Sequence, residues 1–109
     1  MNADMTFRGI DPSEAMEQYA AKYLTKFKKY FGKQEPDSIF VHVVFEGSLN
    51  HHIFSCEVRI KSDHFDLIAK REGAEMYPVI DEVMHIMERE LQVAKQRVVD
   101  DIRKRKKAF

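Results

Sequence analysis

One segment limits the fold more than any other, because it alternates strictly between apolar and polar side chains. The apolar positions are Phe54, Cys56, Val58 and Ile60, and the polar positions between and after them are Ser55, Glu57, Arg59 and Lys61. Successive side chains of a β-strand point to opposite faces, so this alternation predicts a strand with one buried and one solvent-facing side. The chain must therefore form a sheet, and other elements must cover one of its faces.

Three further segments have the pattern of strands. Residues 39–45 are β-branched or aromatic, with one face formed by Ile39, Val41, Val43 and Phe45. A turn is expected over residues 46–50, and another over residues 61–64 ahead of a strand at 65–70. Met5–Arg8 is a shorter candidate. The short connections between the last three strands predict antiparallel pairing.

The first predicted helix spans residues 13–31 and carries an aromatic stripe. We expect Asp11 to cap it with Pro12 in its first turn, and Gly32 to end it. Its apolar residues recur at three- and four-residue steps, as one helix face requires: Met16, Tyr19, Tyr23, Phe27 and Tyr30.

The second predicted helix begins close to Glu75, because Pro78 is tolerated only near a first turn. Its apolar stripe comprises Met76, Ile80, Val83, Met87, Leu91, Ala94 and Val98. The element order is β-α-β-β-β-α, which predicts an α+β fold with one four-stranded sheet and both helices on one face. We expect one domain over residues 1–102 and a basic tail over 103–109, with residues 103–107 frayed.

Composition excludes several classes of protein. The 18 Lys and Arg residues balance 18 Asp and Glu residues, so the chain is not a globally basic nucleic-acid binder, although a locally basic face remains open. The single cysteine, Cys56, excludes an intramolecular disulfide. No apolar run is long enough to span a membrane, and residues 1–5 do not resemble a signal peptide. We expect a soluble, cytoplasmic protein without a membrane partner.

Charge is concentrated on both predicted helices. Lys22, Lys26, Lys29 and Lys33 fall within roughly 60° of one another at about 100° per residue, so they form a stripe that could follow a phosphate backbone. The second helix is acidic at first and basic from Lys95 and Arg97 onward. Both patterns are also typical of solvated helix faces, and the acid-to-base order complements a helix dipole. The residues alone leave both interpretations open.

The sequence contains no recognisable motif for catalysis, metal binding or phosphate binding. The five histidines, His42, His51, His52, His64 and His85, lack the spacing of known metal sites. Cys56 lies on an apolar strand face, and the glycines form no phosphate loop. We therefore expect no catalytic residue, metal, cofactor or small-molecule substrate. The aromatic residues of the first helix belong to the core by their period, which leaves Phe40 as the candidate aromatic side chain on the open sheet face.

Three segments together resemble the ribosome hibernation-promoting factor family, also called the ribosome-associated inhibitor or sigma-factor modulation family. Residues 8–16 are similar to its strand-to-helix passage, and residues 19–31 to its Lys-rich first helix ending in Lys-Tyr-Phe. Residues 72–81 are close to its Glu-Gly-x-Asp-Met-Tyr-x-x-Ile-Asp motif, continued by Arg89 and Leu91. The resemblance covers nearly the whole chain.

The resemblance implies a fold similar to double-stranded RNA-binding domains and binding to the small ribosomal subunit in the messenger and transfer RNA channel. Occupation of that channel would inhibit translation by steric exclusion and store idle ribosomes. The chain looks like a short member, of the type that assists a separate ribosome-pairing factor. Arg8, Lys22, Lys26, Lys29, Arg89 and Lys95 match basic positions of the family, and the charge pattern adds Lys33 and Arg97 as RNA-binding candidates.

The chain also departs from the family. Ile86, Gln92 and Val93 stand where family members often have basic residues, and Pro78 replaces a usual Ala. These departures affect the expected ribosome affinity rather than the fold. The zero net charge and the acidic start of the second helix favour an alternative function: an interaction module or regulator that binds an acidic protein partner.

Overall fold

A four-stranded sheet and two long helices make up the fold, in the predicted order β-α-β-β-β-α. The computed structural model describes residues 1–48 and 50–107, without the side chain of Lys107. The strands and α-helices are β1 (Asn2–Arg8), α1 (Glu14–Phe27), β2 (Phe40–Ser48), β3 (Ile53–Lys61), β4 (Asp66–Gly73) and α2 (Met76–Lys107). Two 3-10 helices, η1 (Lys28–Tyr30) and η2 (Pro36–Ser38), lie between α1 and β2.

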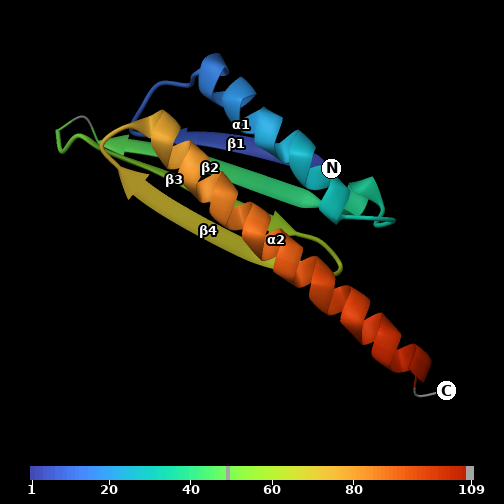
Figure 1. The fold of residues 1–109 in the computed structure, drawn as a ribbon. Helices are drawn as coiled ribbons and strands as arrows, with labels where there is room; N and C mark the ends of the chain where they lie inside the picture. Colours follow the sequence, from blue (N-terminus) through green and yellow to red (C-terminus); the bar gives the residue numbers. More distant parts are fainter. Residues whose placement is uncertain (49, 108–109) are drawn as a thin grey trace.

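The strands lie in the order β1-β2-β3-β4. The pairs β2–β3 and β3–β4 are antiparallel, as the short connections predict, whereas β1 and β2 are parallel because α1 crosses between them. Figure 1 shows both helices on the same face of the sheet, with the opposite face uncovered. The predicted fold class is therefore confirmed.

The alternation along β3 is confirmed by its burial. Cys56, Val58 and Ile60 are fully buried beneath the helices, and Arg59 and Lys61 are exposed on the other face. Ser55 is an exception, since it is buried although it belongs to the polar set. It lies between its register partners, Glu46 of β2 and Glu72 of β4.

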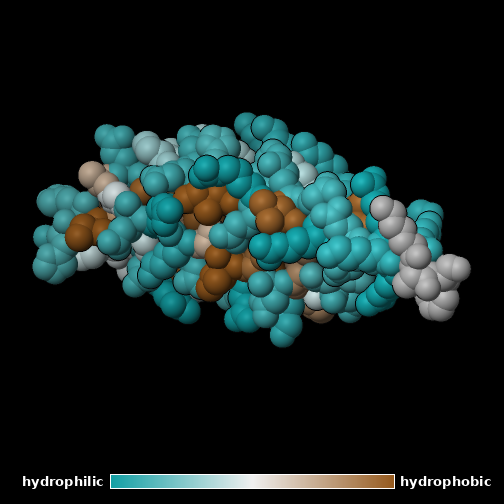
Figure 2. Space-filling model, turned by 60° about the horizontal axis from the view of Figure 1, so that its bottom comes forward, coloured by the Kyte–Doolittle hydropathy of each residue, from teal (hydrophilic) through white to brown (hydrophobic). Residues whose placement is uncertain are grey.

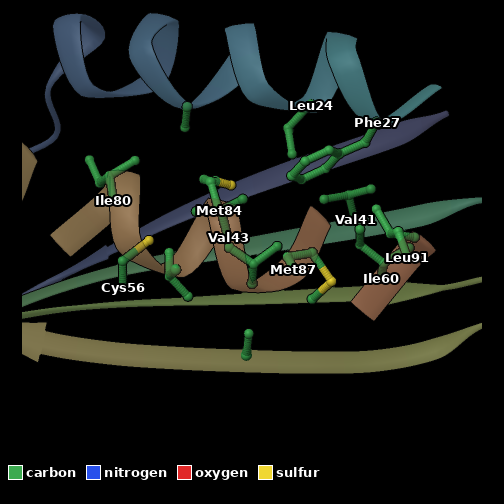
Figure 3. Close-up of a cluster of buried hydrophobic side chains, with 14 of the residues drawn as sticks. Leu24, Phe27, Val41, Val43, Cys56, Ile60, Ile80, Met84, Met87 and Leu91 are labelled. Atoms are coloured by element: carbon green, nitrogen blue, oxygen red, sulfur yellow. The ribbon is translucent and has the colours of Figure 1, made fainter. Parts of the chain in front are cut away.

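The core lies between the sheet and the two helices (Figure 3). Leu24 and Phe27 of α1 point into it, as do four α2 residues, Ile80, Met84, Met87 and Leu91. The predicted α2 stripe is confirmed but too narrow, because it omits Met84, which is fully buried. Since α2 packs against both the sheet and α1, its buried face is wider than packing on one surface requires.

The start and end predicted for α1 are wrong. Ser13, not Asp11, is the N-cap: its backbone is extended and its hydroxyl accepts a hydrogen bond from the Met16 N–H at 3.2 Å. The α-helix ends at Phe27, where η1 continues in a tighter winding. Gly32 follows with a φ of +58°, a left-handed conformation that favours glycine.

Several strand and helix ends also differ from the prediction. β1 begins at Asn2 because it pairs with β2 residue by residue, and β2 continues to Ser48, through part of the predicted turn. β4 runs to Gly73, which pairs with Phe54. The basic segment predicted to fray is helical through Lys107, since Lys and Arg are good helix formers and suit a helix C-terminus.

We predict that Gly9→Ala destabilises the fold more than Gly32→Ala. Both glycines have positive φ, which costs an L-residue about 1–2 kcal/mol. At Gly9 an added Cβ would also lie 2.2 Å from the carbonyl oxygen of Gly47, whereas Gly32 has open space around it. Urea denaturation should therefore give the Gly9 variant the lower free energy of unfolding, by at least about 1 kcal/mol. Equal losses would contradict the close packing of Gly9 on β2.

Candidate nucleic-acid interface

The two helices run side by side in the same direction, and polar contacts fix their register. Tyr19 and Tyr23 near the middle of α1 reach Asp81 in the second turn of α2. Tyr30 of η1 reaches Glu88, farther along α2. The order of contacts is thus the same along both helices, as Figure 1 shows. Basic residues late in α1 are consequently placed beside the middle of α2.

Asp81 accepts hydrogen bonds from two tyrosine hydroxyls. Tyr19 Oη donates to Asp81 Oδ1 at 2.6 Å, and Tyr23 Oη donates to the same oxygen. Desolvation would raise the pKa of Asp81, but the two hydroxyl donors outweigh it and hold that pKa below its ordinary value. The hydrogen bond to Asp81 raises the pKa of Tyr19, and burial raises the pKa of Tyr23. The site therefore favours a charged carboxylate between two neutral phenols.

A second contact joins the helices one step farther along. Tyr30 Oη donates to Glu88 Oε1 at 3.2 Å, and the Gln92 side-chain amide donates to Tyr30 Oη at 3.1 Å. Gln92 is one of the positions where the resemblance to the family leads us to expect a basic residue. The structure gives it a positional role, because it orients the tyrosine that anchors η1 to α2.

Five exposed lysines lie on or next to this helix pair, and we call them the lysine face. Lys22 and Lys26 belong to α1 and Lys95 to α2, whereas Lys29 lies in η1 and Lys33 in the following loop, because α1 ends before the predicted stripe does. Lys95 Nζ donates to the Lys29 carbonyl oxygen at 3.2 Å. The ammonium groups of Lys26 and Lys29 lie 5.5 and 5.1 Å from the ring centroids of Tyr23 and Tyr30, within cation–π range. Lys33 and Lys95 line one groove of about 430 Å³. Two of the tyrosines that bind α2, Tyr23 and Tyr30, therefore also contact lysines of this face.

The three predicted arginines do not join the lysine face, although all are exposed. Arg8 ends β1 at the Glu46 end of the sheet, whereas η1 and Lys33 precede the opposite end of β2. Arg89 and Arg97 line a separate groove of about 460 Å³ between α2 and β4. That groove is largely apolar, with Leu67, Ile86, Val93 and Ala94 in its lining, and Figure 2 shows hydrophobic surface gathered across the middle of the molecule.

The cysteine and the two adjacent histidines, which were considered for catalysis or metal binding, lie on the buried face of β3 and in a turn. Cys56 is fully buried, and burial raises the pKa of its thiol to about 12. His51 and His52 lie in a turn, where His52 has a positive φ. Within residues 1–48 and 50–107, no three His, Cys, Asp or Glu side chains are grouped closely enough to hold a metal ion. In the same part of the chain, no helix is long and apolar enough to cross a membrane.

The comparison with protein families gives one match. The profile of the family described as Sigma 54 modulation protein / S30EA ribosomal protein matches residues 3–99. The chain belongs to this family. The resemblance is thus confirmed over most of the sequence, from the second residue of β1 to residue 99 within α2. A search of curated proteins finds no match.

Two solved structures are similar to this family member. The Protein Y N-terminal domain of Thermus thermophilus has a TM-score of 0.71 at 20% identity, over 84% of this chain and 96% of that one. A ribosomal subunit interface protein from Coxiella burnetii has a TM-score of 0.70 at 26% identity, over 88% of this chain and 99% of that one. The first similarity shows the shared fold, and the second adds a ribosome-associated protein of the same architecture.

Sequence reasoning missed the residues that hold the interface together. Asp81 belongs to the segment that resembles the family motif. Its position in the sequence, however, predicted only that it contributes to the acidic start of the second helix. The tyrosines were assigned to the core by their period, and their rings are indeed partly buried. Their hydroxyl groups were the available signal, because a half-buried tyrosine needs a polar partner within reach of its ring.

We predict that Asp81→Asn removes part of the acid sensitivity of the fold. The folded-state pKa of Asp81 is lowered, so its contribution to stability is complete above the unfolded pKa of about 4 and is lost as the pH falls through the folded value. The variant should be less stable at pH 7, by roughly 1–2 kcal/mol. Its stability should also fall less steeply between about pH 5 and pH 2.

Chemical denaturation across this pH range measures both effects. Asp63→Asn is the matched control, because Asp63 is an exposed carboxylate without an ion pair among the described residues. If the two variants had the same stability and the same pH dependence, the contact between Asp81 and the tyrosines would have no energetic role.

Proposed function

We propose that the chain binds the small ribosomal subunit in the channel for messenger and transfer RNA, and inhibits translation by occupying it. The observation that carries this proposal is the lysine face, five exposed cations on α1, η1, the loop after η1 and α2, in a member of a family described as ribosomal. Ribosome binding places the chain in the cytoplasm. Occupation of the channel would keep ribosomes idle and stored. This inhibition requires no covalent chemistry.

Local charge explains how a chain without net charge can bind RNA. The carboxylates between the helices, Asp81 and Glu88, are partly buried and accept hydrogen bonds from tyrosine hydroxyls. The lysines beside them are exposed. An approaching phosphate therefore meets the ammonium groups first, and each phosphate neutralised releases condensed counterions. Recognition of backbone and shape needs no contact with base edges.

A second function is favoured by the groove between α2 and β4. Its apolar lining includes Ile86 and Val93, where the resemblance to the family leads us to expect basic residues. Two cations, Arg89 and Arg97, and one acidic residue, Glu90, also line it. An apolar groove bordered by cations fits an acidic protein partner. A separate ribosome-pairing factor is one such partner. This function predicts a protein complex that survives nuclease treatment.

We predict that Lys22→Glu combined with Lys26→Glu abolishes co-sedimentation with ribosomes on sucrose gradients. Both lysines are exposed, so the fold should persist, as circular dichroism can check. Lys70→Glu with Arg71→Glu makes the same change in net charge on exposed β4 residues and should retain binding, although Arg71 loses a surface ion pair with Glu82. Undiminished binding by the α1 variant would exclude docking through the lysine face.

We also predict that ribosome affinity depends steeply on salt. If the lysine face neutralises about four phosphates, affinity should fall roughly 100-fold between 50 and 200 mM salt. Gradients at the two concentrations test this, with migration beside the small subunit expected only at the lower one. A shift of whole ribosomes into paired particles would identify the pairing-assisted type. Equal migration at both concentrations would instead favour the protein-partner function.

A further inference from the structure

The uncovered face of the sheet presents an aromatic side chain to solvent. Phe40, the first residue of β2, is 55% exposed, as the sequence predicts. It lies on the opposite side of the sheet from the helices, so the lysine face does not use it. One exposed apolar residue is ordinary, and its surroundings therefore decide whether it can bind a ligand.

Strand register places polar partners around the ring. Asn2 of β1 and Lys61 of β3 are directly opposite Phe40. The next row on the same face consists of Asp4, His42 and Arg59. All six residues line one hollow of about 410 Å³, together with Ala3 and Val41. An exposed ring thus forms part of a concave site with both cationic and acidic side chains.

Hydrogen bonds and ion pairs show which of these groups can contact a ligand. Arg59 Nη2 lies 3.3 Å from Asp66 Oδ1, so its charge is already paired. His42 Nε2 lies 3.0 Å from Thr6 Oγ1 and 3.8 Å from Asp4 Oδ2. Lys61 has no ion pair within the described part of the chain, and the Asp4 side chain is 76% exposed. The hollow therefore offers a ring, an unpaired cation and an accessible carboxylate.

We propose that this hollow binds a base of single-stranded RNA. The base stacks on Phe40, its phosphate lies beside Lys61, and its exocyclic amino group donates to Asp4. Stacking on sheet aromatics is a common way of holding unpaired RNA bases. The acceptor at Asp4 favours cytosine, which has an amino group, over uracil, which has a carbonyl oxygen at that position.

RNA fits this site better than an added peptide strand. Phe40 belongs to β2, whose backbone is hydrogen-bonded to β1 on one side and to β3 on the other. Beside this hollow a peptide could extend the sheet only along the outer edge of β1, and a strand added there would not lie over the Phe40 ring. The unpaired Lys61 supplies the complementary charge for a phosphate. The site goes beyond the proposed docking through the lysine face and does not depend on it.

Fluorescence anisotropy with labelled single-stranded RNA hexamers tests the proposal. Hexacytidine and hexauridine are titrated against the full chain carrying Lys22→Glu and Lys26→Glu, so that the lysine face does not capture them. Phe40→Ala in this background should weaken hexacytidine binding about tenfold, and Phe40→Tyr should retain it. Ile68→Ala is the matched control, because Ile68 is an aliphatic residue on the same face with the same 55% exposure.

Base preference gives a second readout. Hexacytidine should bind more tightly than hexauridine, and Asp4→Asn should remove the preference, because an amide can pair with either base. Equal losses from Phe40→Ala and Ile68→Ala would overturn the stacking contact, and equal binding of the two hexamers would overturn the contact with Asp4. These titrations contain no ribosomes, so their result is independent of the sedimentation experiments.

Discussion

The contact between Asp81 and two tyrosines of α1 determines how the helices stand relative to each other. The sheet supports both helices through the apolar core, and polar contacts add to this packing at one position along the helix axes. Hydroxyl groups directed at one carboxylate oxygen fix that position, and the Tyr30 contacts with Glu88 and Gln92 extend the constraint. In this register Lys95 Nζ donates a hydrogen bond to the Lys29 carbonyl oxygen. The lysine face is therefore a product of helix pairing and not of α1 alone.

The sequence predicted the buried faces of helices and strands better than it predicted where these elements begin and end. The alternation along β3 and the stripes of both helices identified most of the core, because periodicity follows directly from backbone geometry. Strand ends depended on the partner strand: β2 continues through Glu46 because Arg8 and Ser55 pair with it. The predicted RNA-binding residues do not form one surface, because spacing along the chain does not show which element each helix face contacts. Spacing places Arg97 on a face of α2, and the structure shows that this face borders β4.

The departures from the family fall on two sides of α2. Gln92 faces α1 and supports Tyr30, so the charge lost there is exchanged for a hydrogen bond between the helices. Ile86 and Val93 face β4 and line an apolar groove with Leu67. These substitutions leave the lysine face intact and change the opposite side of the helix. The structure thus separates the lysine face from the apolar groove between α2 and β4.

The long second helix gives the neutral molecule a strong electrical polarity. The molecule extends 61 Å along its longest axis and only 24 and 17 Å across it, and α2 projects beyond the sheet at its basic end (Figure 1). The side chains of α2 are mainly acidic in its first half and mainly basic near its end. These charges are opposite in sign to the roughly half charge that the helix backbone places at each end, and they are larger. The electric field of a polyanion acts on this charge distribution before the two molecules touch. It favours orientations in which the basic end of α2 points toward the polyanion. Orientation during approach is thus determined by the arrangement of charge, even though the total charge is zero.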